Sequence, residues 1–309
     1  MANITAAQVK ELRERTGLPM MECKKALVSS EGDMEEAIKI LREKGMLKGK
    51  GKESRVAADG LVDILKEGNV TVMVEVNSET DFVAKNDTFK KFVKGILNTI
   101  YKNRPASVEA LFADKYDDTD LTVEEKQNEM RFTIGEKISI RRFAVIEGIT
   151  STYIHGNGGI GVVVLFDTDE ATAAKPAFEE FAKNIALQVA AYNVSYVDRD
   201  AVPESVINEE KAILMAQIQG DPSNAKKPAN IIEKMATGRL GKFYEANCLS
   251  DQEYVKDDSL KVSAYVAQTA KELGASIAIK AFYRFEKGEG IEKREDDLAA
   301  EVAKLTGQN

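Results

Sequence analysis

Few side chains in this sequence are suited to covalent or metal chemistry. The 309 residues include one histidine, His155, and two cysteines, Cys23 and Cys248. A structural zinc site takes four Cys or His ligands, and two separated cysteines cannot supply it. A Ser-His-Asp triad would need His155 as its base, and no G-x-S-x-G turn accompanies it. Carboxylates are plentiful, but none forms a spaced pair in a recognisable acid–base context. The sequence therefore predicts no catalytic residue, no metal site and no cofactor.

One segment formally matches a dinucleotide-binding loop. Residues 156–161 read Gly-Asn-Gly-Gly-Ile-Gly, which satisfies G-x-G-x-x-G. That function requires a helix after the glycines, because the helix N-terminus receives the pyrophosphate. Here the chain continues as Val162–Phe166, an apolar run typical of a strand. A tight hairpin turn is therefore favoured over a cofactor site.

The segment best suited to recognition is Thr80–Asn86. It follows the apolar run Val70–Val76, which is typical of a buried strand, and it precedes a helix-spaced apolar stripe. Turns between strand and helix lie at the surface, so Phe82, beside a carboxylate, can act as an exposed aromatic anchor for a protein. An unbroken helix through this segment would instead bury Phe82 in the stripe, whereas a cap at Asn86 would separate the two. The spacing leaves both interpretations open.

The composition is that of a globular protein with about two domains. Of the residues, 43% are hydrophobic and 30% are charged, and the net charge is −8. This acidic balance argues against direct nucleic-acid binding, which depends on Lys and Arg. No apolar run approaches the roughly 18 residues of a membrane helix, and the N-terminal residues do not resemble a signal peptide. Two isolated cysteines are typical of reduced thiols, so we expect a cytoplasmic protein without membrane contact.

Residues 1–47 are expected to form a compact three-helix module. Thr5 and Gln8 fit a capping box, and Gly45 ends the last helix. A unit this small is marginal alone, so it either leans on the rest of the chain or acts as a tethered binding module. Residues 48–55 begin with alternating Lys and Gly (48–52), which indicates a flexible linker. A nucleic-acid patch is the weaker interpretation of this linker, because it contains no aromatic residue.

An internal repeat predicts the core. A strand followed by a helix with F-x-x-F occurs twice, about ninety residues apart, at Val72–Val76 with Phe89 and at Val162–Phe166 with Phe178. The repeat predicts an α+β fold with two similar subdomains, residues 56–147 and 148–286. The second copy has no aromatic residue where the first has Phe82. This difference favours a task for Phe82 that is specific to the first subdomain.

Two helical elements complete the expected organisation. Around residues 202–246, two antiparallel helices joined at Gly220–Asn224 predict a projecting hairpin. Residues 287–309 are expected to form a C-terminal helical module. The hairpin can dimerise or stay free, so a homodimer and a heterotetramer with a partner both stay open.

Several motifs, in order, resemble the elongation factor Ts family of bacterial type over nearly the whole chain. The residues that carry the resemblance are Leu12–Gly17, Met20–Met21, Cys23–Leu27, Thr80–Asn86, Ile134–Glu136, Ile140–Arg142, Tyr153–Gly156 and Arg284–Gly290. The resemblance implies a ubiquitin-associated-like N-terminal module, two α+β core subdomains, a projecting helical hairpin and a C-terminal helix.

The resemblance also implies a function. A member of this family is a translation elongation factor that binds the GTPase elongation factor Tu with GDP and promotes GDP release, without covalent chemistry. The resemblance places the element that displaces magnesium at Thr80, Asp81, Phe82 and Val83, with Phe82 inserting between partner helices. The other partner contacts that it implies are Arg13, Met20, Met21, Ile134, Gly135 and His155.

The sequence departs from the family pattern at two places, and two rival functions are weighed. Leu18–Pro19 stands where small residues are common, and Gly159 stands where arginine is frequent. One rival is a scaffold that binds the GTPase and leaves nucleotide release unchanged. The other is an enzyme that binds a dinucleotide at the glycine segment and would lose that binding if Gly158 were made bulky.

Overall fold

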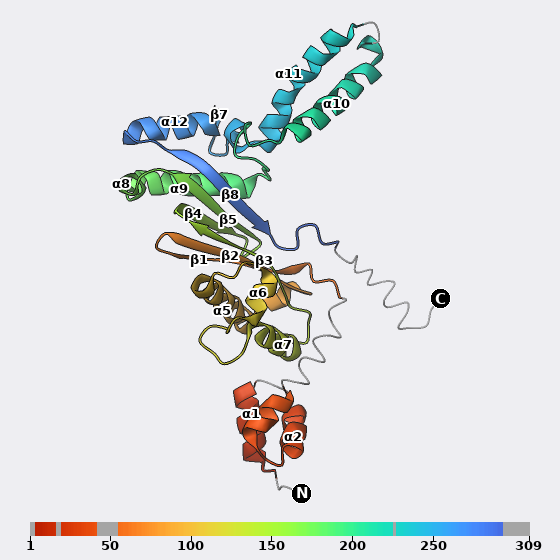
Figure 1. Cartoon of the computed structure of the whole chain (residues 1–309), viewed down its shortest axis with the longest axis vertical. Helices are drawn as coiled ribbons and strands as arrows, with labels where there is room; N and C mark the ends of the chain where they lie inside the picture. Colours follow the sequence, from red (N-terminus) through yellow and green to blue (C-terminus); the bar gives the residue numbers. More distant parts are fainter. Residues whose placement is uncertain (1–3, 17–19, 42–54, 225–226, 293–309) are drawn as a thin grey trace.

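The computed structural model describes residues 4–16, 20–41, 55–224 and 227–292 (Figure 1). It combines helices with small antiparallel sheets, which confirms the expected α+β class. The expected linker at 48–55 lies outside the described residues except for Arg55, and so does the turn at 17–19. Of the C-terminal helical module expected at 287–309, residues 287–292 are described and form a turn without helix, and residues 293–309 lie outside the described residues. Across the described residues, no helix is both long and apolar enough to cross a membrane.

The N-terminal helices pack around a small apolar core. They are α1 (Ala6–Thr16), α2 (Met20–Ser29) and the helical residues 34–41. The capping box at Thr5 is present, because the Gln8 amide donates to Thr5 Oγ1 at 3.2 Å and the Thr5 amide donates to Gln8 Oε1 at 3.0 Å. Phe132, from the first core subdomain, packs against this N-terminal core. The module therefore leans on the rest of the chain through an apolar contact.

The first sheet has three antiparallel strands in the order β1-β2-β3. The strands are β1 (Asp59–Glu67), β2 (Val70–Ser78) and β3 (Ser139–Glu147). The helices of this part are α4 (Asp81–Lys85), α5 (Asp87–Asn103), α6 (Val108–Ala113) and α7 (Val123–Ile134). The buried stripe predicted from the sequence lies on α5 and packs on this sheet.

The second sheet repeats the arrangement, with strand order β4-β5-β8. Its strands are β4 (Ile149–His155), β5 (Ile160–Asp167) and β8 (Ala278–Glu286), and the helices near it are α8 (Glu170–Ala173), α9 (Pro176–Ala191) and α12 (Val262–Leu273). The sequence reasoning did not predict α12, nor the segment before it with η2 (Leu249–Asp251) and the short strands β6 (Glu253–Tyr254) and β7 (Asp257–Lys261).

The two sheets pack face to face. Residues of β2 alternate between two environments: Val72, Val74 and Val76 pack on the α5 side, whereas Met73 packs with Val163 of the second sheet. Because both faces of β2 are covered, all nine of its residues are buried. Helices therefore lie outside a double layer of sheets, with α5 and α7 on one side and α9 and α12 on the other (Figure 1).

A helical hairpin extends from the second half of the molecule. It consists of α10 (Glu204–Gly220), η1 (Pro222–Asn224) and α11 (Ala229–Asn247). Figure 1 shows the hairpin projecting away from both sheets. Its two arms are held by a small apolar cluster around Ile218, Ile232 and Ala236.

Candidate functional site

Phe82 stands out from the surface of the first subdomain. Helix α4 ends before Asn86, whose side chain accepts a hydrogen bond from the Thr88 amide at 2.8 Å and caps α5. The cap separates Phe82 from the buried stripe of α5, and the side chain of Phe82 is 78% exposed. Of the two interpretations left open by the sequence, the structure therefore selects the exposed one. An exposed phenylalanine on a fixed short helix is available to a partner protein.

Two contacts hold α4 in place. Val83, the next residue, is buried and joins the first core. At the start of α4, the Thr80 amide donates to Glu136 Oε2 at 3.0 Å and the Thr80 hydroxyl donates to Glu136 Oε1 at 2.7 Å. The exposed ring is therefore presented by an element that is anchored at its start by Glu136 and in its middle by Val83.

The hydrogen bonds of Glu136 bring two other expected contacts, Ile134 and Gly135, close to α4. Ile134 is the last residue of α7 and packs partly against the first core. Gly135 follows with a φ of 87°, a left-handed conformation that suits glycine at a helix C-terminus, and its amide donates to Arg131 O at 3.1 Å. Ile134, Gly135 and Thr80 thus belong to one connected surface region.

The charges on α4 form a local pair. Lys85 Nζ lies 2.6 Å from Asp81 Oδ2, one helical turn away. This hydrogen bond from Lys85 lowers the pKa of the Asp81 carboxyl, so Asp81 is ionised at neutral pH. The same ammonium group lies 5.7 Å from the centroid of the Phe82 ring. The exposed ring is therefore bordered by a positive charge and a negative charge.

His155 lies at the end of β4, before the glycine segment. It is exposed, and Tyr153 Oη lies 3.2 Å from His155 Nδ1. Residues 156–159 form a turn in which Gly156, Asn157 and Gly158 all have positive φ. Strand β5 follows at once, so the segment lacks the helix N-terminus that a dinucleotide site requires. The glycines serve the hairpin, as the sequence favoured.

The glycines of this turn differ in how closely their neighbours approach. A side chain at Gly158 would approach Leu61 Cβ to 2.8 Å, and the Val62 amide donates to Gly158 O at 2.8 Å, so the turn packs directly on β1. At Gly159, a Cβ would meet only backbone oxygens, the nearest at 3.4 Å. A Cβ would therefore be accommodated at Gly159 in ordinary van der Waals contact.

The three expected contacts in the N-terminal module lie apart from this surface. Arg13 is exposed on α1, and Met20 and Met21 are 52% and 63% exposed on α2. The module lies at the end of the molecule opposite the hairpin (Figure 1). Exposed methionines form an adaptable apolar surface, which suits contact with a protein.

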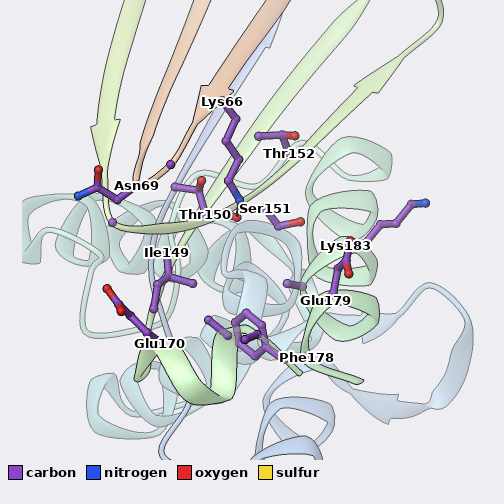
Figure 2. Close-up of a pocket in the computed structure, with 15 residues that line it drawn as sticks. Lys66, Asn69, Ile149, Thr150, Ser151, Thr152, Glu170, Phe178, Glu179 and Lys183 are labelled. Carbon is purple, nitrogen blue, oxygen red and sulfur yellow. Dashed lines mark hydrogen bonds between the residues drawn. The ribbon is translucent and has the colours of Figure 1, made fainter. Parts of the chain in front are cut away.

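A pocket of about 680 Å³ lies at the other ends of the strands (Figure 2). It is enclosed by the turn after β1, the start of β4 and helices α8 and α9. Lys66 extends into it and donates to Thr150 O; burial lowers the pKa of Lys66, and Glu179 opposes this shift. None of the expected contact residues lines this pocket. In the ranges that the structure describes, no group of three or more His, Cys, Asp or Glu side chains is arranged to hold a metal ion.

Sequence reasoning missed a buried charge network behind the site. Glu75, in the middle of β2, has a fully buried side chain. It accepts hydrogen bonds from Arg141 Nη1 at 3.0 Å, Arg142 Nε at 2.6 Å, Asn77 Nδ2 at 3.0 Å and the Gly288 amide at 2.8 Å. Burial acts to raise the pKa of the Glu75 carboxyl, but these hydrogen bonds outweigh it and hold the pKa below its ordinary value. A carboxylate inside an apolar run was the only sequence signal for this network.

The network fixes the segment that follows β8. Gly288 has a φ of 69°, and a Cβ there would lie 2.0 Å from Ala58 O, so only glycine fits. The neighbouring Lys287 donates its amide to Gly159 O at 3.0 Å, and its ammonium group pairs with Asp59. The segment thereby connects both sheets with the β4–β5 turn that follows His155.

Comparison with known proteins gives consistent matches. The family model described as elongation factor TS matches residues 79–289. The chain is 44% identical over 306 residues to elongation factor Ts of Syntrophotalea carbinolica, covering 98% of this chain and 99% of that protein. It is 46% identical over 312 residues to elongation factor Ts of Pediococcus pentosaceus, and the match covers both chains fully. It is 48% identical over 308 residues to elongation factor Ts of Clostridioides difficile, covering 98% of this chain and 99% of that protein. The model match includes α4, the end of α7 and the β4–β5 turn.

Proposed function

Because this chain belongs to the elongation factor Ts family, and so acts in translation elongation, we propose that it binds elongation factor Tu carrying GDP and promotes GDP release. Release of GDP allows GTP to load. The exposed Phe82 on its anchored helix is the observation that carries this proposal.

The proposed mechanism is displacement of magnesium by the α4 element. The element consists of Thr80, Asp81, Phe82 and Val83. Phe82 inserts between partner helices, while Val83 and Thr80 hold α4 in position on the first subdomain. Magnesium bridges the nucleotide phosphates to a GTPase, so its loss weakens nucleotide binding. By reciprocity, nucleotide must weaken the protein complex by the same factor. No bond is made or broken, and the protein is an exchange factor that needs no cofactor of its own.

The remaining expected contacts extend the interface. Arg13, Met20 and Met21 dock the N-terminal module, residues 1–47, which we propose to be ubiquitin-associated-like and tethered by residues 48–55. Ile134 and Gly135 approach the phosphate region, and His155 contacts the same GTPase domain.

The proposed organisation places two subdomains, at 56–147 and 148–286, after that tether. The second carries the hairpin at about 202–246, and a C-terminal module follows at 287–309. The protein works in the cytoplasm. The hairpin is compatible with a homodimer or a heterotetramer with elongation factor Tu.

Release of a fluorescent GDP from preloaded elongation factor Tu tests the proposal. A substoichiometric amount of this protein should accelerate release with turnover. Phe82→Ala should lower the catalytic efficiency of exchange roughly 30-fold, because losing a buried aromatic hot spot costs about 2 kcal/mol. Tyr192→Ala is the matched control and should exchange normally. Tyr192 is another exposed aromatic residue, 45% exposed, and it directly follows the last residue of α9.

The outcomes separate the competing functions. Fast exchange by a folded Phe82→Ala protein would move the mechanism to other contacts. A stable complex without accelerated release would support a scaffold instead of an exchange factor.

A further inference from the structure

A pocket of about 460 Å³ lies between the two parts of the proposed contact surface. Asp81 and Lys85 of α4 line one side, and Ile154 with the turn residues 156–158 lines the other. Residues 60–63 of β1 also contribute to the wall. The pocket therefore joins the Phe82 helix to the His155 turn.

Four lysines line this pocket, and they come from three separate elements. Lys85 lies on α4, Lys90 and Lys94 lie one turn apart on α5, and Lys287 lies in the segment after β8. We refer to this site as the lysine pocket. Its charge runs against that of the whole chain, whose net charge is −8.

Two of these lysines form no close ion pair in the described part of the chain. Lys85 pairs with Asp81, and Lys287 pairs with Asp59. Among the described residues, no carboxylate forms an ion pair with Lys90 or Lys94. Like charges one helical turn apart destabilise a helix, so Lys90 and Lys94 together do not stabilise α5. Asp63 is the remaining carboxylate in the lining; burial raises its pKa, while a hydrogen bond from the Ile64 amide and the charge of Lys94 oppose this shift. Lys94 is therefore partly balanced by Asp63, and Lys90 has no carboxylate partner in the lining.

We infer that the lysine pocket receives acidic side chains of the GTPase and steers the two proteins together before Phe82 docks; this rests on the proposed function. The rim is apolar, with Phe82 beside the pocket at 78% exposed and Ile154 on the wall at 40% exposed. An apolar rim around positive charges matches a protein surface that presents carboxylates beside apolar side chains. Flexible lysines act as strongly hydrated point charges, which favours attraction at a distance over rigid bidentate pairing.

The test is the association rate with elongation factor Tu–GDP, measured by stopped flow at low and high salt. The double variant Lys90→Glu/Lys94→Glu reverses the two charges that form no close ion pair. The matched control is Lys183→Glu/Lys271→Glu, which makes the same change in net charge at exposed lysines on α9 and α12. Circular dichroism confirms that each variant is folded.

The pocket variant should associate about tenfold more slowly at low salt, while the control changes little, because steering depends on local charge. The difference should vanish near 1 M salt, where the screening length is about 3 Å. Inorganic phosphate should slow the wild-type protein no more than chloride does at the same ionic strength.

Each other outcome overturns the inference. Equal slowing of both variants would show an effect of net charge alone, and an unaffected pocket variant would show that the lysines do not steer. Specific competition by phosphate would assign the pocket to a phosphate ligand instead of carboxylates. If the wild-type protein does not bind elongation factor Tu, the proposed function is overturned as well. If the wild-type protein exchanges nucleotide and the pocket variant associates as fast as wild type, only the inference about the lysine pocket is overturned.

Discussion

Replacing Glu75 with glutamine should weaken the whole double-sheet core. The change keeps the shape of the side chain but removes its charge and one of its two acceptor oxygens. Four donors converge on the carboxylate, from Arg141, Arg142, Asn77 and Gly288. A glutamine would point its own NH₂ group at some of them, leaving buried donors without an acceptor.

The size of the loss follows from the exposure of the partners. Removing one member of a fully buried ion pair costs about 3–5 kcal/mol. Here the side chains of Arg141 and Arg142 are 28% and 32% exposed, and Arg142 also pairs with Glu289. Solvent therefore compensates part of the loss, and we expect Glu75→Gln to lower the free energy of unfolding by about 2–3 kcal/mol at pH 7.

The effect has a defined pH dependence. The pKa of Glu75 in the folded protein is below the ordinary value of 4.5, so its charge stabilises the fold fully above pH 4.5. That contribution is lost as the pH falls through the folded pKa. The difference between wild type and Glu75→Gln should therefore be constant near neutrality and shrink progressively below pH 4.5.

Urea unfolding followed by circular dichroism measures this difference, since the chain contains no tryptophan. Glu289→Gln is the control: its pair with Arg142 is 40% exposed on the glutamate side and should contribute about 0–1 kcal/mol. The reasoning is refuted if Glu75→Gln is no more destabilising than Glu289→Gln at pH 7. It is also refuted if the difference persists unchanged in acid.

Two further predictions concern packing. Gly161→Ala should cost about 1–3 kcal/mol of stability by overpacking, because the new Cβ would lie 2.4 Å from Val62 Cγ1 in the opposite sheet. Gly159→Ala is its control in thermal unfolding, and equal midpoints would contradict face-to-face packing of the sheets there. Burial raises the pKa of the Cys248 thiol to about 11, so about one in a thousand of these thiols is ionised at pH 8. In the Cys23→Ser variant Cys248 is the remaining thiol, and a thiol reagent should label it more than tenfold faster in urea than in the native protein. Rapid labelling of the native variant would show that Cys248 is accessible.

The predictable parts of this fold are those set by local pattern. The F-x-x-F repeat and the apolar strands predicted an α+β core, because period and burial can be read within one short window. Whether Phe82 is exposed or buried could not be predicted from a local pattern. Its exposure depends on whether the helix breaks at Asn86, and the apolar spacing is compatible with either outcome.

The parts that escaped prediction depend on partners distant in sequence. Glu75 is joined to Arg141 across 66 positions and to Gly288 across 213. Neither spacing leaves a local signature. The lysine pocket was missed for the same reason, since Lys287 meets Lys90 and Lys94 only after the sheets stack. Helix α12 is the exception, because Val262, Tyr265, Val266 and Leu273 recur at helical spacing and Gly274 ends the helix, so its local signal was present and was overlooked.

The projecting hairpin has a consequence for dynamics. Each arm of 17 to 19 residues extends about 25–28 Å, at 1.5 Å per residue, and its contacts beyond the base are mainly those between its own two helices. Cooperative units with few buried contacts open at a lower free energy than the global fold. Amide protons near the hairpin tip should therefore exchange with solvent through local opening while β2 and β5 stay protected. We therefore expect the hairpin to behave as a separate foldon, so that the double sheet keeps its structure when the hairpin melts.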